Sequence, residues 1–231
     1  MISDFINNLS RLSNSIFHLM ESTASNADFN VDSQDARLVA LSGMQEAVLS
    51  CGLWLKTYHS IGEGHQNESM ILNYSGSNLS LEKTSKIMLN QIRLGLVIMF
   101  HFKLENLLGC LLKKISNKNN IRGLGQMFKV LAEDVNLDDT EKKSNILKAF
   151  SSIRNSLHNN GIHTHPDFET KIGEYNYKFN QDEVTTSASL SHSIHLIGEI
   201  IVIAEEILNS EKVKDIKDMI PEKYSEWLDE Q

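Results

Sequence analysis

Eleven residues near the middle of the chain, IRNSLHNNGIH at 153–163, gather side chains that bind phosphates and transfer protons. Arg154 and His158 are four residues apart, so on a helix they share one face, about one turn from each other. An arginine binds a phosphate through its planar fork of donors, and a histidine titrates near neutrality. Metal-free cleavage of RNA needs a base, an acid and a cation, and this stretch offers a candidate for each role.

Residue type assigns the roles within this stretch. Arg154 is the candidate cation, His158 is the candidate proton-transfer group, and Asn155 adds a neutral hydrogen-bonding group beside them. His163 is a weaker candidate for the second proton-transfer role, because it follows the expected end of the helix. We expect no metal ligand and no cofactor in this site. The further candidate RNA-binding residues are Asn159, Asn160, His163 and Lys148.

The same stretch also has a purely structural interpretation. An Arg–His pair near a helix C-terminus is favoured by the helix dipole without any catalytic purpose. Asn-Asn-Gly at 159–161 suits a helix end, because Gly161 can adopt the left-handed conformation and the two asparagines tolerate unwinding. Spacing alone leaves both interpretations open.

The helix that positions these groups is predicted to begin at Asp138 or Asp139. Either carboxylate is a good N-cap, and Asp138 with Glu141 has the spacing of a capping box. Pro166 excludes a helical continuation beyond the stretch, because it restricts the residue before it. The predicted buried stripe consists of Ile146, Leu147, Phe150, Ile153 and Leu157.

Apolar periodicity predicts a largely helical chain. The helix at 80–115 is apolar on nearly all sides, which predicts burial at the centre of a bundle. Gly62 and Gly64 mark the end of the helix before it, and 61–80 should form a loop with one helical turn around Met70–Leu72. The other helices are expected at about 3–24, 34–59, 122–135, 187–210 and 221–229.

One segment has the alternation of a β-strand. KIGEYNYKFNQDEV at 171–184 alternates apolar or aromatic residues with polar ones, which predicts one or two short strands, or a hairpin, after the motif helix. No internal repeat or low-complexity tract divides the chain. The sequence predicts one all-α domain over 1–231, with a core at about 80–210 and the helices 3–24 and 34–59 packed on it.

The net charge argues against general, non-specific binding to nucleic acid. The chain carries 22 basic and 30 acidic side chains, for a net charge of −8. The charge is unevenly spread, because residues 113–154 carry 9 basic and 5 acidic side chains, a local +4, and the rest carries −12. This basic block is either a docking surface for a specific RNA or a set of solvated helix faces.

Several features predict a cytoplasmic protein that does not enter a membrane. Cys51 and Cys110 lie in apolar helical runs, as buried free thiols do, and indicate no oxidising compartment. The N-terminal residues lack the basic and apolar regions of a signal peptide. The longest apolar run, near Leu94–Phe102, contains His101 and is too short and too polar to span a bilayer.

Two further sets of residues invite a functional interpretation. His163 and His165, with His192 and His195, are candidate zinc ligands, although chance clustering among nine histidines explains them better. Glu105 interrupts an apolar part of the helix at 80–115 and needs a partner if it is buried. It could pair with Arg154 or another base, orient the site, or simply be exposed.

The stretch FSSIRNSLHNNGIH at 150–163 resembles the end of the signature helix of HEPN-type domains, a superfamily of helical bundles common in bacterial toxins and defence proteins. Arg154, Asn155 and His158 match the three motif positions. The resemblance is tight over 147–163 and loose over 80–210. It implies an up-and-down bundle of long helices that dimerises by apposing the motif helices, and the β element after the motif resembles an insertion in some bacterial branches.

The resemblance also implies an activity. Active members are metal-independent endoribonucleases in which two copies of the Arg–His pair form one composite cleft. This chain is therefore expected to be an RNA-directed toxin or phage-defence effector that cleaves RNA by 2′-hydroxyl attack, with an antitoxin or other protein as a partner. The alternative is a non-catalytic module for dimerisation or protein interaction. Active members have four to six residues between Arg and His, but three separate Arg154 from His158, which rotates the histidine by about 100°.

Overall fold

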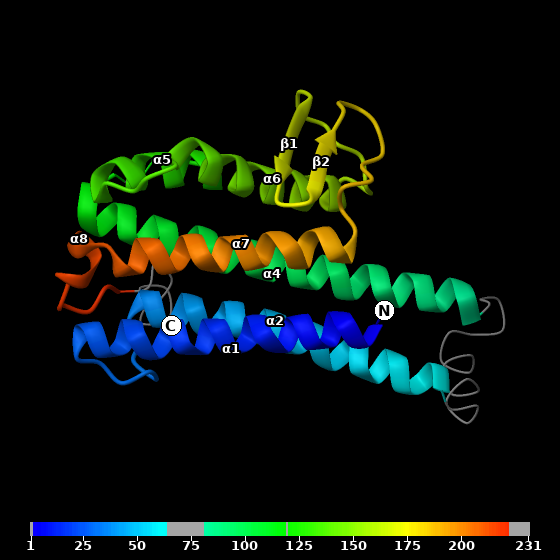
Figure 1. The fold of residues 1–231 in the computed structure, drawn as a ribbon, viewed down its shortest axis with the longest axis horizontal. Helices are drawn as coiled ribbons and strands as arrows, with labels where there is room; N and C mark the ends of the chain where they lie inside the picture. The colour runs from blue at the N-terminus through cyan, green and yellow to red at the C-terminus, as the bar shows by residue number, and fades with distance from the viewer. Residues whose placement is uncertain (1, 64–80, 119, 222–231) are drawn as a thin grey trace, which may run out of the picture.

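The long helices run alternately up and down a bundle (Figure 1). The computed structural model describes residues 2–63, 81–118 and 120–221. The fold is all-α with one short hairpin, as the sequence predicts. Within the described residues the elements, in chain order, are α1 (Ile2–Ala27), α2 (Ala36–Glu63), α4 (Leu81–Ser116), α5 (Leu124–Val135), α6 (Thr140–His158), β1 (Phe168–Ile172), β2 (Tyr175–Phe179), α7 (Leu190–Asn209) and α8 (Glu211–Lys214).

Helix α4 lies at the centre of the bundle from Leu96 onward, whereas its apolar sequence predicts burial along most of its length. It packs along α2 and also contacts α5, α6 and α7. Phe100 of α4 meets Phe150 of α6 edge-on, with the ring centroids 5.9 Å apart. This contact ties the motif helix to the core. The most deeply buried α4 side chains are Val97, Phe100, Leu107, Leu108 and Leu111.

The predicted helices are confirmed to within a few residues, with some exceptions. Helix α2 continues through Gly62, so this glycine does not end it. The short helix α8 was not predicted. The expected turn at Met70–Leu72 lies outside the described residues, as does nearly all of the expected helix at 221–229.

The predicted capping of α6 is wrong. Asp139 is the N-cap residue, but its backbone is left-handed, with φ of 53°, and its side chain makes no capping hydrogen bond. A capping side chain requires an extended backbone at this position, which the turn before α6 does not provide. The Thr140 hydroxyl instead donates to the Leu137 carbonyl at 3.0 Å, closing the turn from α5.

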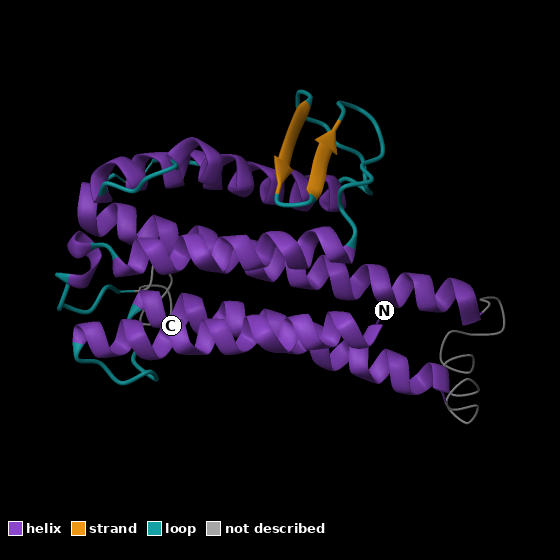
Figure 2. Cartoon of the chain, viewed as in Figure 1, coloured by secondary structure: helices purple, strands orange, loops and turns teal. Residues whose placement is uncertain are grey.

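The β element forms a hairpin that lies across the ends of α6 and α7 (Figure 2). Its two strands are antiparallel and start three residues earlier than the predicted segment. Gly173 opens the two-residue turn with φ of 57°, which glycine adopts without strain. Tyr177 points inward, and its hydroxyl lies 2.7 Å from His195 Nδ1 and donates to the His192 carbonyl at 3.2 Å. These contacts hold the hairpin on α7.

Two segments are long and apolar enough to cross a membrane by length and composition alone. They are Ala36–Ser60 of α2 and Lys86–Ser116 of α4. About half of each segment is buried inside the bundle, 50% and 56% of the tested windows. The core helices of soluble proteins have the same length and composition, so this finding is weak evidence for a membrane span.

A buried ion pair holds the C-terminal segment against the start of α2. The Asp35 carboxylate, fully buried, accepts hydrogen bonds from Arg37 Nε at 2.8 Å and Arg37 Nη2 at 2.9 Å. The same carboxylate accepts from the backbone N–H of Ile220 at 2.9 Å. Arg37 Nη1 donates to the carbonyl of Ile216 at 3.1 Å. The pair therefore joins two segments far apart in the sequence.

Replacing Asp35→Ala should destabilise the fold strongly. The change leaves the Arg37 guanidinium buried without its counter-charge, which costs roughly 3–5 kcal/mol in comparable pairs. Urea unfolding followed by circular dichroism measures the difference. Asp32→Ala, at an exposed position in the same loop, is the matched control and should change the free energy of unfolding by less than about 0.5 kcal/mol. Equal stability of the two variants would contradict this account.

Candidate functional site

The end of α6 is closed by backbone hydrogen bonds. The N–H of Gly161 donates to the Ser156 carbonyl at 2.7 Å, a bond that spans the last helical turn. Asn160 takes the left-handed position of this Schellman arrangement with φ of 55°, and Gly161 follows with φ of 89°. The predicted helix end is therefore confirmed, with Asn160 rather than Gly161 as the first left-handed residue. Asn159, which precedes it, has φ of −97°.

The segment after the motif is pinned to the segment after the hairpin. The N–H of His163 donates to the Glu183 carbonyl at 3.0 Å, and the N–H of Thr185 donates to the Gly161 carbonyl at 2.9 Å. Ile162 and Val184 form an isolated bridge between the same two segments. This pairing folds residues 161–165 back beside the last turn of α6, which brings the side chain of His165 to the motif.

A chain of hydrogen bonds joins an arginine, an amide and an imidazole at this end. Arg154 Nη1 donates to Asn155 Oδ1 at 3.0 Å. Asn155 Nδ2 donates to His165 Nε2 at 3.2 Å. Both ends of the Asn155 amide are thus used, which orients the guanidinium and directs the imidazole. Because His165 Nε2 accepts, the proton of the neutral ring is on Nδ1. His165 is exposed and Arg154 is half-buried.

His158, in the last turn of α6, is exposed. Its imidazole makes no hydrogen bond and no ion pair with any described residue. Four residues before it, Arg154 lies on the same face of the helix, so the two side chains are about one turn apart. An imidazole in this position is free to exchange protons with a molecule bound at the guanidinium.

His163 does not lie at this surface. Its side chain is buried, with 1% of the residue exposed, and its ring lies 5.3 Å from that of Phe179. Its Nε2 donates to the Pro166 carbonyl at 3.3 Å, while Nδ1 is buried without a partner in the described fold. The backbone pairing of residues 161–163 turns this side chain inward. His163 therefore has no access to a bound RNA. His165, not His163, is the histidine of this segment that lies beside the motif.

The remaining candidate RNA-binding residues take three different positions. Asn159 is half-buried, and its Nδ2 donates to Thr164 Oγ1 at 3.2 Å, so it supports the loop. Asn160 is exposed beside the helix end. Lys148 is also exposed, but it lies on the hairpin side of α6 with its Nζ 4.1 Å from the centre of the Phe168 ring. Lys148 is thus separate from the Arg154 face.

His101 of α4 packs against α6 one turn before Arg154. Its Nε2 lies 3.4 Å from Ser151 Oγ, and its ring stacks on Phe150 at 6.0 Å. Burial, and after it the positive charge of Arg154, lower the pKa of His101 to about 4. The Glu105 side chain is 45% exposed, and its carboxylate lies 3.8 Å from His101 Nδ1, not against Arg154. Because His101 is neutral at physiological pH, that contact is not an ion pair there.

The histidines considered as zinc ligands are not brought together. His163 is buried beside the hairpin, whereas His192 and His195 lie on α7. Burial lowers the pKa of both α7 histidines. His192 Nδ1 is 2.6 Å from Ser189 Oγ, and His195 stacks on Tyr175 at 4.4 Å. Within the described ranges no three His, Cys, Asp or Glu side chains could hold a metal ion.

The basic block at 113–154 is partly neutralised by acidic side chains. Lys143 pairs with Glu206 of α7, and Lys118 Nζ lies 3.9 Å from Asp134 Oδ2. Lys114 Nζ is 3.8 Å from Asp218 Oδ2, after α8. These pairs account for several cations of the block. The fold therefore favours solvated helix faces over one continuous docking surface.

No family model, curated protein or solved structure matches the chain. Function must therefore be argued from the residues of this chain alone. Sequence reasoning missed His165 as a member of the site, although the H-x-H spacing of His163 and His165 marked both as candidates. No local signal in the sequence selects between them, because the burial of His163 and the exposure of His165 follow from the pairing of 161–163 with 182–185.

Removing the charge of Arg154 should raise the pKa of His101. Its pKa of about 4 lies below the ordinary 6.5, so the native chain excludes a proton that the unfolded chain binds. Stability from this group is present above pH 6.5 and is lost as the pH falls toward 4. NMR titration of the His101 ring in the parent and in Arg154→Gln measures the shift.

Two results decide this prediction. The titration midpoint of His101 in Arg154→Gln should lie above that of the parent and still below 6.5, because burial persists. A His101→Asn chain should lose less stability than the parent over the same pH interval. An unchanged His101 midpoint in Arg154→Gln would show that the guanidinium does not act on this ring.

Proposed function

We propose that the chain is an HEPN-like, RNA-directed protein and a metal-independent endoribonuclease. The observation that carries the proposal is an accessible imidazole, His158, one turn from the half-buried Arg154 guanidinium, which Asn155 orients at 3.0 Å. An oriented guanidinium beside a free imidazole suits a phosphodiester, because one group binds the phosphate while the other moves a proton. The resemblance of Arg154, Asn155 and His158 to the family motif supports the same assignment.

The reaction needs no group that the chain lacks. A base removes the proton from a ribose 2′-hydroxyl, and the oxygen attacks the adjacent phosphorus. The bond to the 5′-oxygen of the next nucleotide breaks, and an acid gives that oxygen a proton. The products are a 2′,3′-cyclic phosphate and a 5′-hydroxyl. Arg154 stabilises the charge that develops on the phosphate oxygens, and His158 performs one proton transfer.

His165 is the second exposed imidazole at the motif. It is held by Asn155 at 3.2 Å, with Nδ1–H turned away from that hydrogen bond. One chain thereby offers two exposed imidazoles, His158 in the last turn of α6 and His165 hydrogen-bonded to Asn155. This arrangement supplies an acid and a base even with three residues between Arg154 and His158. A homodimer would add a second His158 to the same cleft.

The proposed setting is the cytoplasm of a bacterial cell, in a toxin or phage-defence role, with an antitoxin or other protein as a regulator. Free thiols support a reducing compartment. Burial raises the pKa of the Cys51 thiol to about 12, so it is an inert apolar side chain. The alternative function is a non-catalytic dimerisation or protein-interaction module, favoured by the apolar side chains exposed on α2 and α4.

Cleavage of RNA in the presence of EDTA should depend on Arg154 and His158. The purified chain is incubated with end-labelled total RNA, and the ends of the products are identified by mass spectrometry. Arg154→Ala and His158→Ala should each reduce the rate by about 10²–10⁴, the usual contribution of a positioned acid or base. His165→Ala should also reduce the rate. Replacing Asn155 should reduce it too, because Arg154 and His165 would both lose the hydrogen bond that orients them.

Matched controls exist on α1. Arg11 and His18 are exposed residues of the same types, so Arg11→Ala and His18→Ala should leave the cleavage rate unchanged. Equal loss in control and motif variants would indicate a contaminating nuclease. Absence of cleavage with every class of RNA would falsify the enzymatic proposal and leave the interaction module.

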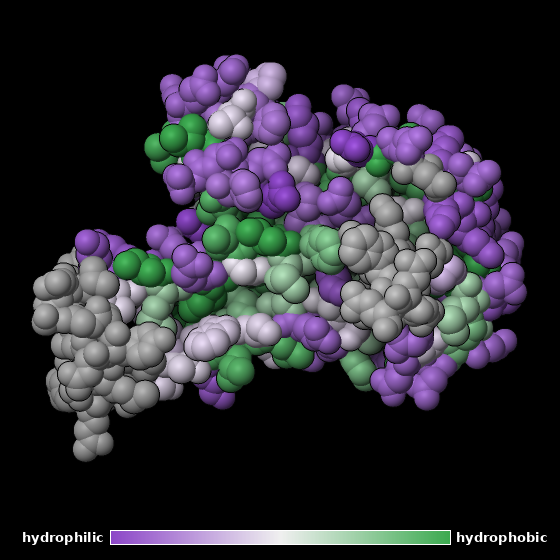
Figure 3. Space-filling view, turned by 180° about the vertical axis from the view of Figure 1, so that it is seen from behind, coloured by the Kyte–Doolittle hydropathy of each residue, from purple (hydrophilic) through white to green (hydrophobic). Residues whose placement is uncertain are grey.

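The rear face of the bundle supports the proposed homodimer. Figure 3 shows hydrophobic side chains gathered on this face, which α2 and α4 form. The exposed large apolar residues of these two helices are Leu49, Leu53, Trp54, Ile87, Met99 and Phe102. A second copy packed on this face would cover exposed apolar side chains.

Light scattering should report a dimer, and Met99→Lys should shift it toward monomer, because a buried lysine without a partner is costly at an interface. Val202→Lys on α7 is the matched control, since Val202 is 52% exposed away from the rear face. It should leave the dimer intact. A parent chain that stays monomeric over the whole concentration range removes the composite cleft from the proposal, while the pair His158 and His165 within one chain remains.

A further inference from the structure

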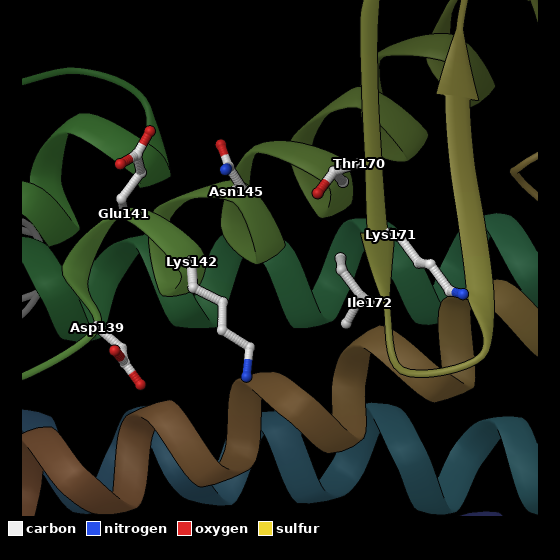
Figure 4. A pocket seen from close by; sticks show the side chains of 7 residues that line it. All are labelled: Asp139, Glu141, Lys142, Asn145, Thr170, Lys171 and Ile172. Atoms are coloured by element: carbon white, nitrogen blue, oxygen red, sulfur yellow. The ribbon is translucent and has the colours of Figure 1, made fainter.

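A pocket of about 470 Å³ lies between the first turns of α6 and strand β1, away from the Arg154 end (Figure 4). One wall is α6 with the turn before it, and the other is three consecutive residues of β1. Consecutive residues of a strand point to opposite faces, so three in a row line one pocket only where the edge of the strand borders it. The lining residues are Asp139, Glu141, Lys142, Asn145, Thr170, Lys171 and Ile172.

The hairpin register shows which backbone groups face the pocket. Ile172 and Tyr175 flank the two-residue turn, so they form a hydrogen-bonded pair, and the next pair along, Lys171 and Asn176, does not. The N–H and C=O of Lys171 therefore point outward from β1, away from β2. Figure 4 shows the side chains of Thr170 and Ile172 turned toward α6 and that of Lys171 turned away, so Lys171 borders the pocket with its backbone.

The outer edge of β2 follows the same register as that of β1. Unlike the β1 edge, it has a hydrogen-bonding partner within the chain. Lys178 has the same outward parity as Asn176, and its N–H donates to Ser187 Oγ at 2.9 Å. The Ser187 hydroxyl in turn donates to the Lys178 carbonyl at 3.2 Å. One serine thus satisfies the outward backbone groups of Lys178 on β2. The corresponding groups of Lys171 on β1 have no hydrogen bond to any described residue.

We infer that this pocket binds an extended peptide segment of a partner protein, which adds to β1 as a third strand. Main-chain hydrogen bonds to Lys171 would supply the affinity, as in other cases of strand addition. Helix α6 lines the pocket opposite β1. This inference does not depend on RNA cleavage, because the pocket and the Arg154 face are separate parts of α6.

The charges of the pocket favour a peptide over a nucleic acid. Asp139 and Glu141 carry two negative charges and Lys142 carries one positive charge, while the Lys171 side chain is turned away, so the lining has a net charge of −1. A nucleic-acid strand carries one negative charge per phosphate, and the two carboxylates would repel it. A peptide backbone is neutral, and a basic side chain of the peptide can meet the two carboxylates. The side chains of Asn145 and Thr170 can hydrogen-bond to a peptide or to a nucleic acid.

A phage-displayed library of random linear peptides, selected on the full-length protein, tests the inference. Enriched peptides should bind with slowed amide hydrogen exchange at Lys171, measured by NMR. Lys171→Pro removes the outward N–H without touching the ladder, because that group does not bond to β2. It should weaken binding by about tenfold or more, the effect of one lost main-chain hydrogen bond and the clash of the ring.

Two matched variants separate the edge of β1 from other effects. Asn176→Pro makes the same change at the paired position on the other strand, and it should leave peptide binding unchanged. Lys171→Ala removes the side chain and keeps the N–H, so it should weaken binding much less than Lys171→Pro. If Lys171→Pro unfolds the hairpin, two other measurements decide. One is the slowed exchange of the Lys171 amide when peptide binds the parent. The other is the loss of peptide binding in Asn145→Trp, whose indole fills the pocket from α6.

Three outcomes overturn the inference. The first is a selection that enriches no peptide. The second is peptide binding that survives both Lys171→Pro and Asn145→Trp, or that leaves the exchange of the Lys171 amide unchanged. The third is displacement of the peptide by a fluorescein-labelled single-stranded oligouridine that loses affinity in Lys171→Ala, which would make the pocket a track for nucleic acid.

Discussion

The burial of α4 is the constraint on which the rest of the fold depends. This helix of 36 residues is apolar on nearly every side, and from Leu96 onward its buried side chains pack among α2, α5, α6 and α7. The edge-on contact of Phe100 with Phe150 fixes the rotation of α6 about its own axis. That rotation decides which residues of α6 are buried. It leaves Arg154 half-buried beside His101 and His158 in solvent.

The amide of Asn155 is the second constraint, on a smaller scale. It accepts from Arg154 and donates to His165, so a single neutral side chain orients a cation and a titratable ring. The ring reaches it only because residues 161–163 pair with 182–185. The hairpin therefore contributes to the site without supplying a side chain to it. Its aromatic face and its hydrogen bonds to α7 keep the returning segment in place.

The helices and the hairpin were predictable because their signals are local. Periodicity marks α1, α2, α4, α6 and α7, and alternation with Gly173 marks the hairpin. The inward turn of His163 and the approach of His165 were not, since they depend on pairing between segments twenty residues apart. The capping of α6 failed for a similar reason. Asp139 has the right side chain, but the connection from α5 imposes a left-handed backbone on it.

The hydroxyl of Ser187 has a consequence for how copies of this chain can associate. A two-stranded hairpin has two edges, and when both are unpaired the sheet can extend from molecule to molecule without limit. Here Ser187 occupies the outward backbone groups of Lys178 on the β2 edge. Two copies paired through their β1 edges would leave the β2 edges outermost, where this serine opposes further extension of the sheet.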